Sequence, residues 1–271
     1  MSTTTAPTKS ILFISATGGI ALSTLKRCLA ASSRASLTIT VLARFPTRLQ
    51  GLLSPTELAF PSLRIIEGNA HSTSDIIPVL THPSNPTSLV DIIVTGIGAK
   101  PDMKNLTVDN PSVCEKGAKA LMEALGKVQS TPGSSSGQEK PYIIAISAAG
   151  ASTLHREYPL ALYPVHALLL KAAIKDKRAM ERVLIDNSDK LLDGKLTVIR
   201  PSMLTNKPEI GLEKVRVATE DLRKNQLEGE KVVGYTISRE DVGKWIFERL
   251  AVGGGDEGVR KYLGRAVVLS Y

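Results

Sequence analysis

Near its start the chain has a run of β-forming residues that passes directly into a glycine-containing turn and then into a helical pattern. Residues 10–15 are mostly apolar, Gly18 and Gly19 lie in the turn, and apolar residues at spacings of three and four follow over 22–30. A strand, a tight turn and a helix in this order form the first half of a nucleotide-binding βαβ unit. Glycines there let the backbone approach a pyrophosphate, whose charge then lies against the helix N–H groups.

Two residues of this turn depart from the dinucleotide-binding pattern G-A-T-G-x-x-G. Ser15 stands at the first glycine position and Ala21 at the third. Alanine at the third position still permits close packing of helix on strand. Ser15 restricts the turn and adds a hydroxyl. A plain structural turn remains the alternative, but the location between the first strand and the first helix favours nucleotide binding.

The length and the residue distribution predict one folded domain. A chain of 271 residues can bury a large core as a single unit. We expect a flexible tail over residues 1–9 and a single domain over 10–271. Segments 151–166 and 207–235 are predicted to cover the active-site cleft, and the Ser/Gly-rich stretch 130–140 is predicted to be a flexible loop.

The charge balance suits an anionic small ligand. Lys and Arg number 34 and Asp and Glu 26, giving a net charge of +8. The basic residues are scattered, with no run of five and few aromatics, so we predict no nucleic-acid binding. No stretch approaches about 18 apolar residues, so we predict no membrane span.

The chemistry-bearing side chains show no metal-type grouping. Cys28 and Cys114 do not form a ligand pair, and no His/Cys/Asp/Glu group has suitable spacing, so we predict no metal site. The two cysteines are typical of buried thiols in a reducing compartment. Residues 1–8 lack the apolar core of a signal peptide, which favours a cytoplasmic location.

Strand-like and helix-like segments alternate along the chain. Strands are expected over residues 37–43, 63–70, 89–98, 142–147, 196–202 and 266–269. Helices are expected over 74–80, 114–128 and 167–184, and a last one is expected to begin at Ser238, an N-cap that Asp241 completes as a box-like arrangement. This alternation predicts an α/β fold, a doubly wound parallel sheet with a small C-terminal substrate cap.

The residues after the second and third strands bear on the cofactor. An acid after the second strand would hold the ribose hydroxyls of NAD, but Arg44 stands there, and a guanidinium suits the 2′-phosphate of NADP(H). A solvated surface arginine is the alternative. Asn69 could contact the adenine through its amide. Gly96 leaves room for a cofactor to pass the carboxyl end of its strand.

Several segments together resemble one family. Ala16-Thr17-Gly18-x-x-Ala21, Arg44, Lys177-x-x-x-Glu181, the strand 197–201 and residues 238–242 are similar to the atypical short-chain dehydrogenase/reductases, in the NAD(P)H-binding, NmrA-like branch. The resemblance covers nearly the whole chain in the expected order and implies an NAD(P)-binding Rossmann fold.

The resemblance also implies positions for the cofactor-binding residues. Thr17, Gly18, Gly19 and Ile20 would lie on the pyrophosphate, Arg44 on the 2′-phosphate, Asn69 and Ala70 near the adenine, Gly96 and Ile97 along the cofactor, Ser147, Ala148 and Lys177 near the nicotinamide, and Pro201 and Ser202 near its carboxamide.

The catalytic pair of the wider superfamily is absent. That pair is Tyr-x-x-x-Lys, in which the tyrosine protonates the developing alkoxide. Four residues after Tyr158 and Tyr163 stand Leu162 and Ala167. The remaining catalytic candidates are Ser147, Lys177 and Tyr163. Each also has an ordinary interpretation, as a strand-ending serine, a solvated lysine and a packing tyrosine.

Two functions therefore remain open. The first is an NADP(H)-dependent oxidoreductase that acts on a small organic carbonyl, enone or quinone-like substrate. The second is a non-catalytic NADP(H)-binding protein that reports redox state to a partner, and an isomerase or cyclase on the same fold is a further alternative. We expect a small-molecule substrate and a monomer or homodimer.

Overall fold

The computed structural model describes residues 9–31, 37–99, 101–102, 107–131, 139–252 and 255–271. The predicted N-terminal tail, apart from Lys9, lies outside the described residues, as does most of the predicted loop 130–140. No helix in the described ranges is long and apolar enough to cross a membrane.

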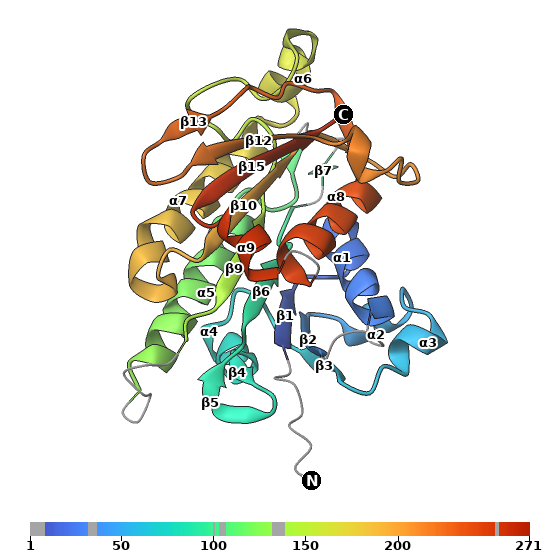
Figure 1. Cartoon of the computed structure of the whole chain (residues 1–271), viewed down its shortest axis with the longest axis vertical. Coiled ribbons are helices and arrows are strands. Elements are labelled where there is room, and N and C mark those ends of the chain that lie inside the picture. The colour runs from blue at the N-terminus through green and yellow to red at the C-terminus, as the bar shows by residue number, and fades with distance from the viewer. Residues whose placement is uncertain (1–8, 32–36, 100, 103–106, 132–138, 253–254) are drawn as a thin grey trace.

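The described strands form one large sheet, with the order β13-β12-β15-β10-β9-β6-β1-β2-β3 (Figure 1). From β15 to β3 every neighbouring pair is parallel, and β12 and β13 add an antiparallel edge. The bounds are β1 (Lys9–Ile14), β2 (Leu37–Ala43), β3 (Leu63–Glu67), β6 (Ile92–Thr95), β9 (Tyr142–Ile146), β10 (Leu196–Pro201), β12 (Arg216–Asp221), β13 (Gln226–Glu228) and β15 (Arg265–Ser270). The predicted doubly wound parallel sheet is confirmed. Its strand order reverses between β1 and β6, which is where open α/β sheets bind their ligands.

Helices cover both faces of the sheet. The main ones are α1 (Gly19–Ala30) and α8 (Arg239–Ile246) on one face, and α5 (Val113–Gln129) and α7 (Lys171–Leu192) on the other. The short elements are α2 (Pro46–Gln50), α3 (Pro55–Leu58), α4 (Thr73–Ile76), α6 (Tyr163–Leu168), α9 (Gly255–Arg260), β4 (Thr81–His82), β5 (Asn85–Leu89), β7 (Pro101–Asp102), β8 (Thr107–Val108), β11 (Met203–Thr205) and β14 (Thr236–Ser238).

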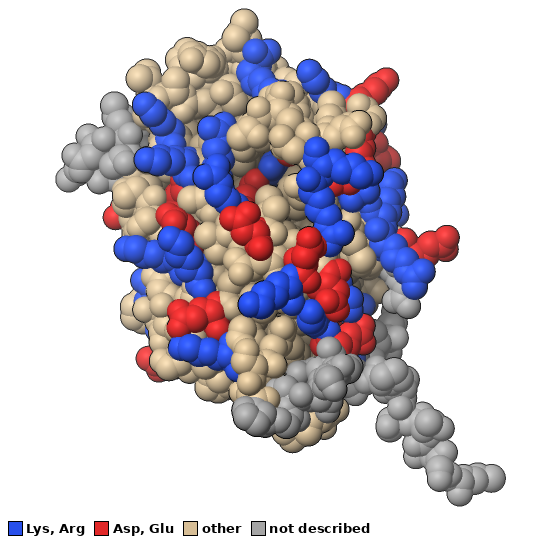
Figure 2. Space-filling view, turned by 90° about the vertical axis from the view of Figure 1, so that its left-hand side faces the viewer, with Lys and Arg blue, Asp and Glu red and all other residues tan. Residues whose placement is uncertain are grey.

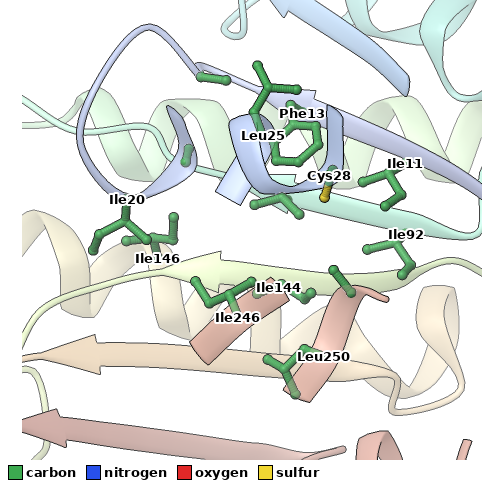
Figure 3. Packing of buried hydrophobic residues seen from close by; sticks show 14 of the residues in the cluster. Ile11, Phe13, Ile20, Leu25, Cys28, Ile92, Ile144, Ile146, Ile246 and Leu250 are labelled. Atoms are coloured by element: carbon green, nitrogen blue, oxygen red, sulfur yellow. The ribbon is translucent and has the colours of Figure 1, made fainter. Parts of the chain in front are cut away.

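Alternate residues along the central strands pack into two separate apolar clusters, one on each face of the sheet. Figure 3 shows one of them, in which Ile11 and Phe13 of β1 and Ile144 of β9 pack against Leu25 of α1 and Ile246 of α8. Leu12 and Ile14 point to the opposite cluster, under α5 and α7. Because both faces of the sheet are covered, its inner strands read as continuous apolar runs.

Several predicted elements have different bounds in the structure. The strand expected over 63–70 ends at Glu67, and the helix expected over 74–80 is α-helical only from Thr73 to Ile76. The strand expected over 89–98 is shorter, because Asn85–Leu89 pairs with β4 as a hairpin and only Ile92–Thr95 joins the sheet. The helix expected over 167–184 begins at Lys171 and continues to Leu192. Its polar last turns stay helical because Leu191 and Leu192 are buried in the core.

The segment 207–235, predicted as part of a cap, belongs partly to the main sheet. β12 and β13 lie within it, and β12 pairs with β15 over its whole length. This part of the segment is therefore a sheet edge. The covering role of its remainder, and of 151–166, stays a prediction.

The start of α8 is held by side chains from two directions. Ser238 is its N-cap, as predicted, and accepts hydrogen bonds from the N–H groups of Glu240 (3.0 Å) and Asp241 (3.3 Å). Asp241 does not complete a capping box. Its carboxylate instead accepts from the N–H groups of Ile210 (2.9 Å) and Gly211 (3.1 Å), because the loop before β12 passes beside it.

Candidate functional site

The glycine-containing turn after β1 has two residues with positive φ. Ser15 has φ 65° and Gly19 has φ 60°, so the serine at the first glycine position adopts a left-handed conformation. Such a conformation costs a non-glycine residue on the order of 1–3 kcal/mol. Ser15 thus adopts at this cost a conformation that glycine takes freely.

The N-terminus of α1 presents bare N–H groups. Its N-cap is Gly18, no side chain caps it, and its first turn has no acidic residue. A Cβ built at Gly18 would find no atom within 4 Å, so there is open space beside the turn. Unpaired N–H groups and the positive end of a helix dipole fit a diphosphate. Thr17 is half-buried beside them, and Ile20 points its side chain into the core (Figure 3).

The turn lies directly against the end of β6. A Cβ at Gly96 would come 2.8 Å from Cβ of Ala21 and 3.2 Å from the carbonyl oxygen of Ser15. Alanine is accommodated at the third glycine position because the residue facing it has no side chain. The close approach places Gly96 and Ile97 beside the turn, at the point where the strand order reverses.

The predicted adenosine end of the site lies after β2 and β3. Arg44 is exposed there. The N–H of Asn69 donates to Asp75 (2.8 Å), and its amide oxygen accepts from the N–H of His71 (3.1 Å), so the loop that also carries Ala70 is fixed. The hydrogen bond from Asn69 is the main reason that the pKa of Asp75 lies below its ordinary value. Phe45, the residue after Arg44, is 60% exposed.

Lys177 of α7 joins the carboxyl ends of two central strands. Its Nζ donates to the carbonyl oxygens of Ile97, after β6, and Ile146, at the end of β9, both at 2.7 Å. Cys114 Sγ donates to the same Ile97 oxygen (3.3 Å). Lys177 is therefore a half-buried residue at the carboxyl ends of two central strands and not the solvated surface lysine of the ordinary interpretation.

Ser147, directly after β9, is held by the same helix. Its hydroxyl donates to the carboxylate of Glu181, one helical turn beyond Lys177. The spacing Lys177-x-x-x-Glu181 thus places both side chains over the end of β9. Since its proton is directed to Glu181, Ser147 offers a ligand only the lone pairs of its oxygen. Ala148 follows it, half-buried.

A buried ionic cluster lies behind Ser147. Arg200 of β10 pairs with Glu181 (2.6 Å), Glu220 of β12 (2.9 Å) and Glu157 (3.2 Å), and the four side chains are at most 5% exposed. Burial disfavours the charge of Arg200, but the carboxylates, above all Glu181, outweigh it and raise its pKa above the ordinary value. Burial raises the pKa of Glu157. In the sequence, the signal for this cluster was Arg200, a charged residue within an otherwise apolar strand.

The same cluster fixes the loop after Ser147. Glu157 accepts from the N–H groups of Gly150 (2.6 Å) and Ser152 (3.2 Å), and the Ser152 hydroxyl donates to Glu220 (2.7 Å). Arg178 of α7 donates to the carbonyl oxygen of Gly150 (2.7 Å). The loop is thereby fixed through backbone contacts.

The segment with the third catalytic candidate lies above this loop. His166 of α6 stacks on Tyr158 with ring centroids 3.5 Å apart, and a Cβ at Gly150 would come 3.2 Å from the His166 ring. Tyr163 is 56% exposed, and no contact within the described ranges joins it to Ser147 or Lys177. The structure therefore brings Ser147 and Lys177 together and leaves Tyr163 apart from them.

The two residues predicted near the carboxamide lie at the end of β10. Pro201 is the last residue of the strand, and both Pro201 and Ser202 are buried. The Ser202 hydroxyl accepts from Ser270 (3.0 Å), and its N–H donates to Leu269 (2.9 Å). Their contact with a cofactor stays a prediction.

One family model and several known proteins are similar to this chain. A family model described as NAD(P)H-binding matches residues 15–251. The chain is 34% identical to Reductase pytE of Aspergillus terreus over 96% of this chain and 97% of that protein. It is 31% identical to Oxidase pynE of Aspergillus niger, over 90% and 94%. The crystal structure of the oxidoreductase ylbE from Lactococcus lactis superposes with a TM-score of 0.61 at 17% identity, covering 96% of this chain and 90% of that one.

Proposed function

Because this chain belongs to the NAD(P)H-binding, NmrA-like family of atypical short-chain dehydrogenase/reductases, we propose that it is an NADP(H)-dependent oxidoreductase. Its substrate is a small organic carbonyl, enone or quinone-like compound. The observation that carries the proposal is the position of Lys177 and Ser147 at the carboxyl ends of β6 and β9, beside the uncapped start of α1.

The choice of NADP(H) rests on the end of β2. The bare N–H groups of Gly18, Gly19 and Ile20 would hold the diphosphate, as they would for either dinucleotide. Arg44 is exposed directly after β2, where we expect the adenosine ribose, and no acidic residue neighbours it in the sequence. A guanidinium binds a phosphate in bidentate geometry, so this residue favours the 2′-phosphate of NADP(H).

The bound nicotinamide supplies a hydride, and the protein's residues supply orientation and proton contacts. An ammonium has three N–H donors, and Lys177 directs two of them to Ile97 and Ile146. The third can donate to an oxygen of the ligand. Ser147 can accept from a ligand hydroxyl or amide, and Glu181 keeps its oxygen in place.

The substrate class is supported by apolar side chains on the segment above the site. Leu160 is 66% exposed, Tyr163 56% and Leu168 69%, within nine residues of one another. Exposed apolar side chains gathered on one segment are typical of a surface that contacts an apolar ligand.

Figure 2 shows that the face carrying α5 and α7 has Lys and Arg interspersed with Asp and Glu. This mixture of charges does not favour binding of a polyanion such as a nucleic acid.

Two buried thiols, Cys28 and Cys114, support a reducing, cytoplasmic location.

A non-catalytic, redox-sensing role is the second candidate. The chain has no Tyr-x-x-x-Lys pair, and the proton of Ser147 is directed to Glu181. Both observations remove a proton donor that a simple ketone reduction would use. In this case the protein binds NADP(H) without turnover.

The test measures NADPH oxidation at 340 nm with a panel of quinones, enones and aldehydes. We expect saturable turnover with at least one acceptor, and a fall in kcat of at least tenfold in Lys177→Met on losing the proton contact. Lys175→Met is the matched control, because Lys175 is exposed on the same helix. NADPH binding without turnover over the panel would favour the sensor role. Conversion of a substrate without a change in nicotinamide redox state would favour an isomerase or cyclase.

A further inference from the structure

Arg239 lies close to the glycine turn, although the two are far apart in the sequence. It is the first residue of α8, and its backbone is fixed by the Ser238 cap. α8 begins beside the start of α1. Ser23 of α1 donates to Glu240 (2.8 Å), and a Cβ at Gly243 would come 2.5 Å from Cβ of Ser23. The two helix starts are therefore in direct contact.

The Arg239 side chain extends over the glycine turn. Its Nε is 3.7 Å and its Cδ 3.9 Å from the Cβ position of Gly19. One N–H of the guanidinium donates to the side-chain oxygen of Asn206 (2.7 Å). Within the described ranges no carboxylate pairs with Arg239. A guanidinium has five N–H donors, so four remain for a ligand.

A hollow of about 210 Å³ opens at this place. Gly19, Lys26, Lys207 and Arg239 are among the residues that line it. Its one acidic residue, Glu240, is already engaged by Ser23 and Arg27. The hollow is thus a cationic space directly beside the bare N–H groups of α1.

We propose that Arg239 is a cofactor-binding residue that contacts the diphosphate of the dinucleotide. The proposal rests on the proposed function and deepens it by adding a ligand from the C-terminal part of the chain. Arg44 reads the 2′-phosphate, which only NADP(H) carries. Arg239 lies at the opposite, diphosphate end of the binding turn, so its contact is common to NADP(H) and NAD(H). We therefore expect Arg44 to affect binding of NADP(H) alone and Arg239 to affect binding of both dinucleotides.

The experiment measures Kd for NADPH and for NADH by nicotinamide fluorescence. Loss of a charged phosphate contact weakens binding by about tenfold to hundredfold. We expect Arg239→Gln to weaken both dinucleotides by this factor to the same extent, and Arg239→Lys to recover part of the loss. Arg249→Gln is the matched control, since it removes the same charge from an exposed position just after α8, and both Kd values should be unchanged.

Asn206→Ala distinguishes a direct contact of Arg239 with the dinucleotide from a purely structural role of Arg239. It removes the hydrogen bond that anchors Arg239 but leaves the guanidinium, so we expect a smaller loss than for Arg239→Gln. An equal loss in the two variants would overturn the proposal, as would a loss confined to NADPH. Unchanged binding in Arg239→Gln, with a selective loss in Arg44→Gln, would overturn this proposal alone. A wild-type protein that binds neither dinucleotide would overturn the proposed function as well.

Discussion

Arg200→Met tests whether the buried cluster behind Ser147 depends on its cation. Methionine fills a similar volume but leaves Glu157, Glu181 and Glu220 without a positive charge, and their side chains are 0%, 5% and 4% exposed. Removing one partner of a buried ion pair costs about 3–5 kcal/mol, because the remaining charge is uncompensated. We expect a loss of that size, which corresponds to a melting temperature lower by roughly 10 °C.

The loss depends on pH with a definite sign. Without the cation that opposes it, burial raises the pKa of Glu157 in the folded variant further above the value of about 4.3 in the unfolded chain. The folded variant then binds more protons than the unfolded chain, so its stability falls as the pH rises through this window. Burial already raises the pKa of Glu157 in the wild type. The stability of the wild type therefore also falls as the pH rises, but less than that of the variant. The deficit of the variant is smallest near pH 5 and largest near pH 8.

Urea unfolding of wild type and variant at pH 5 and pH 8 measures both effects. Arg265→Met is the matched control, because Arg265 also pairs with two carboxylates, of Glu228 and Asp221, but its side chain is 26% exposed. Such a pair contributes about 0–1 kcal/mol. A deficit of Arg200→Met no larger than that of Arg265→Met, or one that is constant with pH, would refute the reasoning.

Three further predictions concern separate parts of the chain. Arg44→Gln should raise Kd for NADPH about tenfold to hundredfold but not for NADH, and an equal rise for both, measured by fluorescence titration, would contradict the 2′-phosphate assignment. Gly243→Ala should lower the free energy of unfolding by about 1–3 kcal/mol because its Cβ would meet α1, whereas Gly126→Ala, with no atom within 4 Å, should raise it by about 0.5–1 kcal/mol; denaturant unfolding distinguishes them. Burial raises the pKa of Cys28 to about 12 and of Cys114 to about 11, so iodoacetamide at pH 8 should label both thiols only after unfolding, as read by mass spectrometry.

The sequence predicts the central sheet well because its strands are covered on both faces. β2, β9 and β10 are wholly buried, and burial on two faces requires the unbroken apolar runs that the sequence shows. The antiparallel edge gives no such signal. β12 contains Arg216, Glu220 and Asp221, and it becomes a strand through pairing with β15, far away in the chain.

The local parts of the site could be predicted, and the long-range parts could not. The turn around Gly18 is coded by neighbouring residues. By contrast, the cap of α5 comes from Asp176, which accepts from the N–H groups of Cys114 (2.9 Å) and Glu115 (3.0 Å). Ser112, the adjacent N-cap residue, makes no side-chain cap. Contacts of this kind depend on how helices pack and leave no periodic pattern in the sequence.

If the proposed function holds, the contacts of Lys177 and Ser147 constrain which acceptors the protein would reduce. A simple ketone becomes an alkoxide on hydride addition and needs an acid in the transition state. The Ser147 hydroxyl donates its hydrogen bond to Glu181, and Lys177 donates two of its three N–H groups to backbone oxygens. Of these two side chains, only one donor therefore remains for a ligand, the third N–H of Lys177. An enone or quinone places the developing negative charge on a conjugated oxygen, which a single hydrogen bond can stabilise until water supplies the proton. Under the proposed function we therefore expect turnover with enones or quinones to exceed turnover with simple ketones in the 340 nm assay.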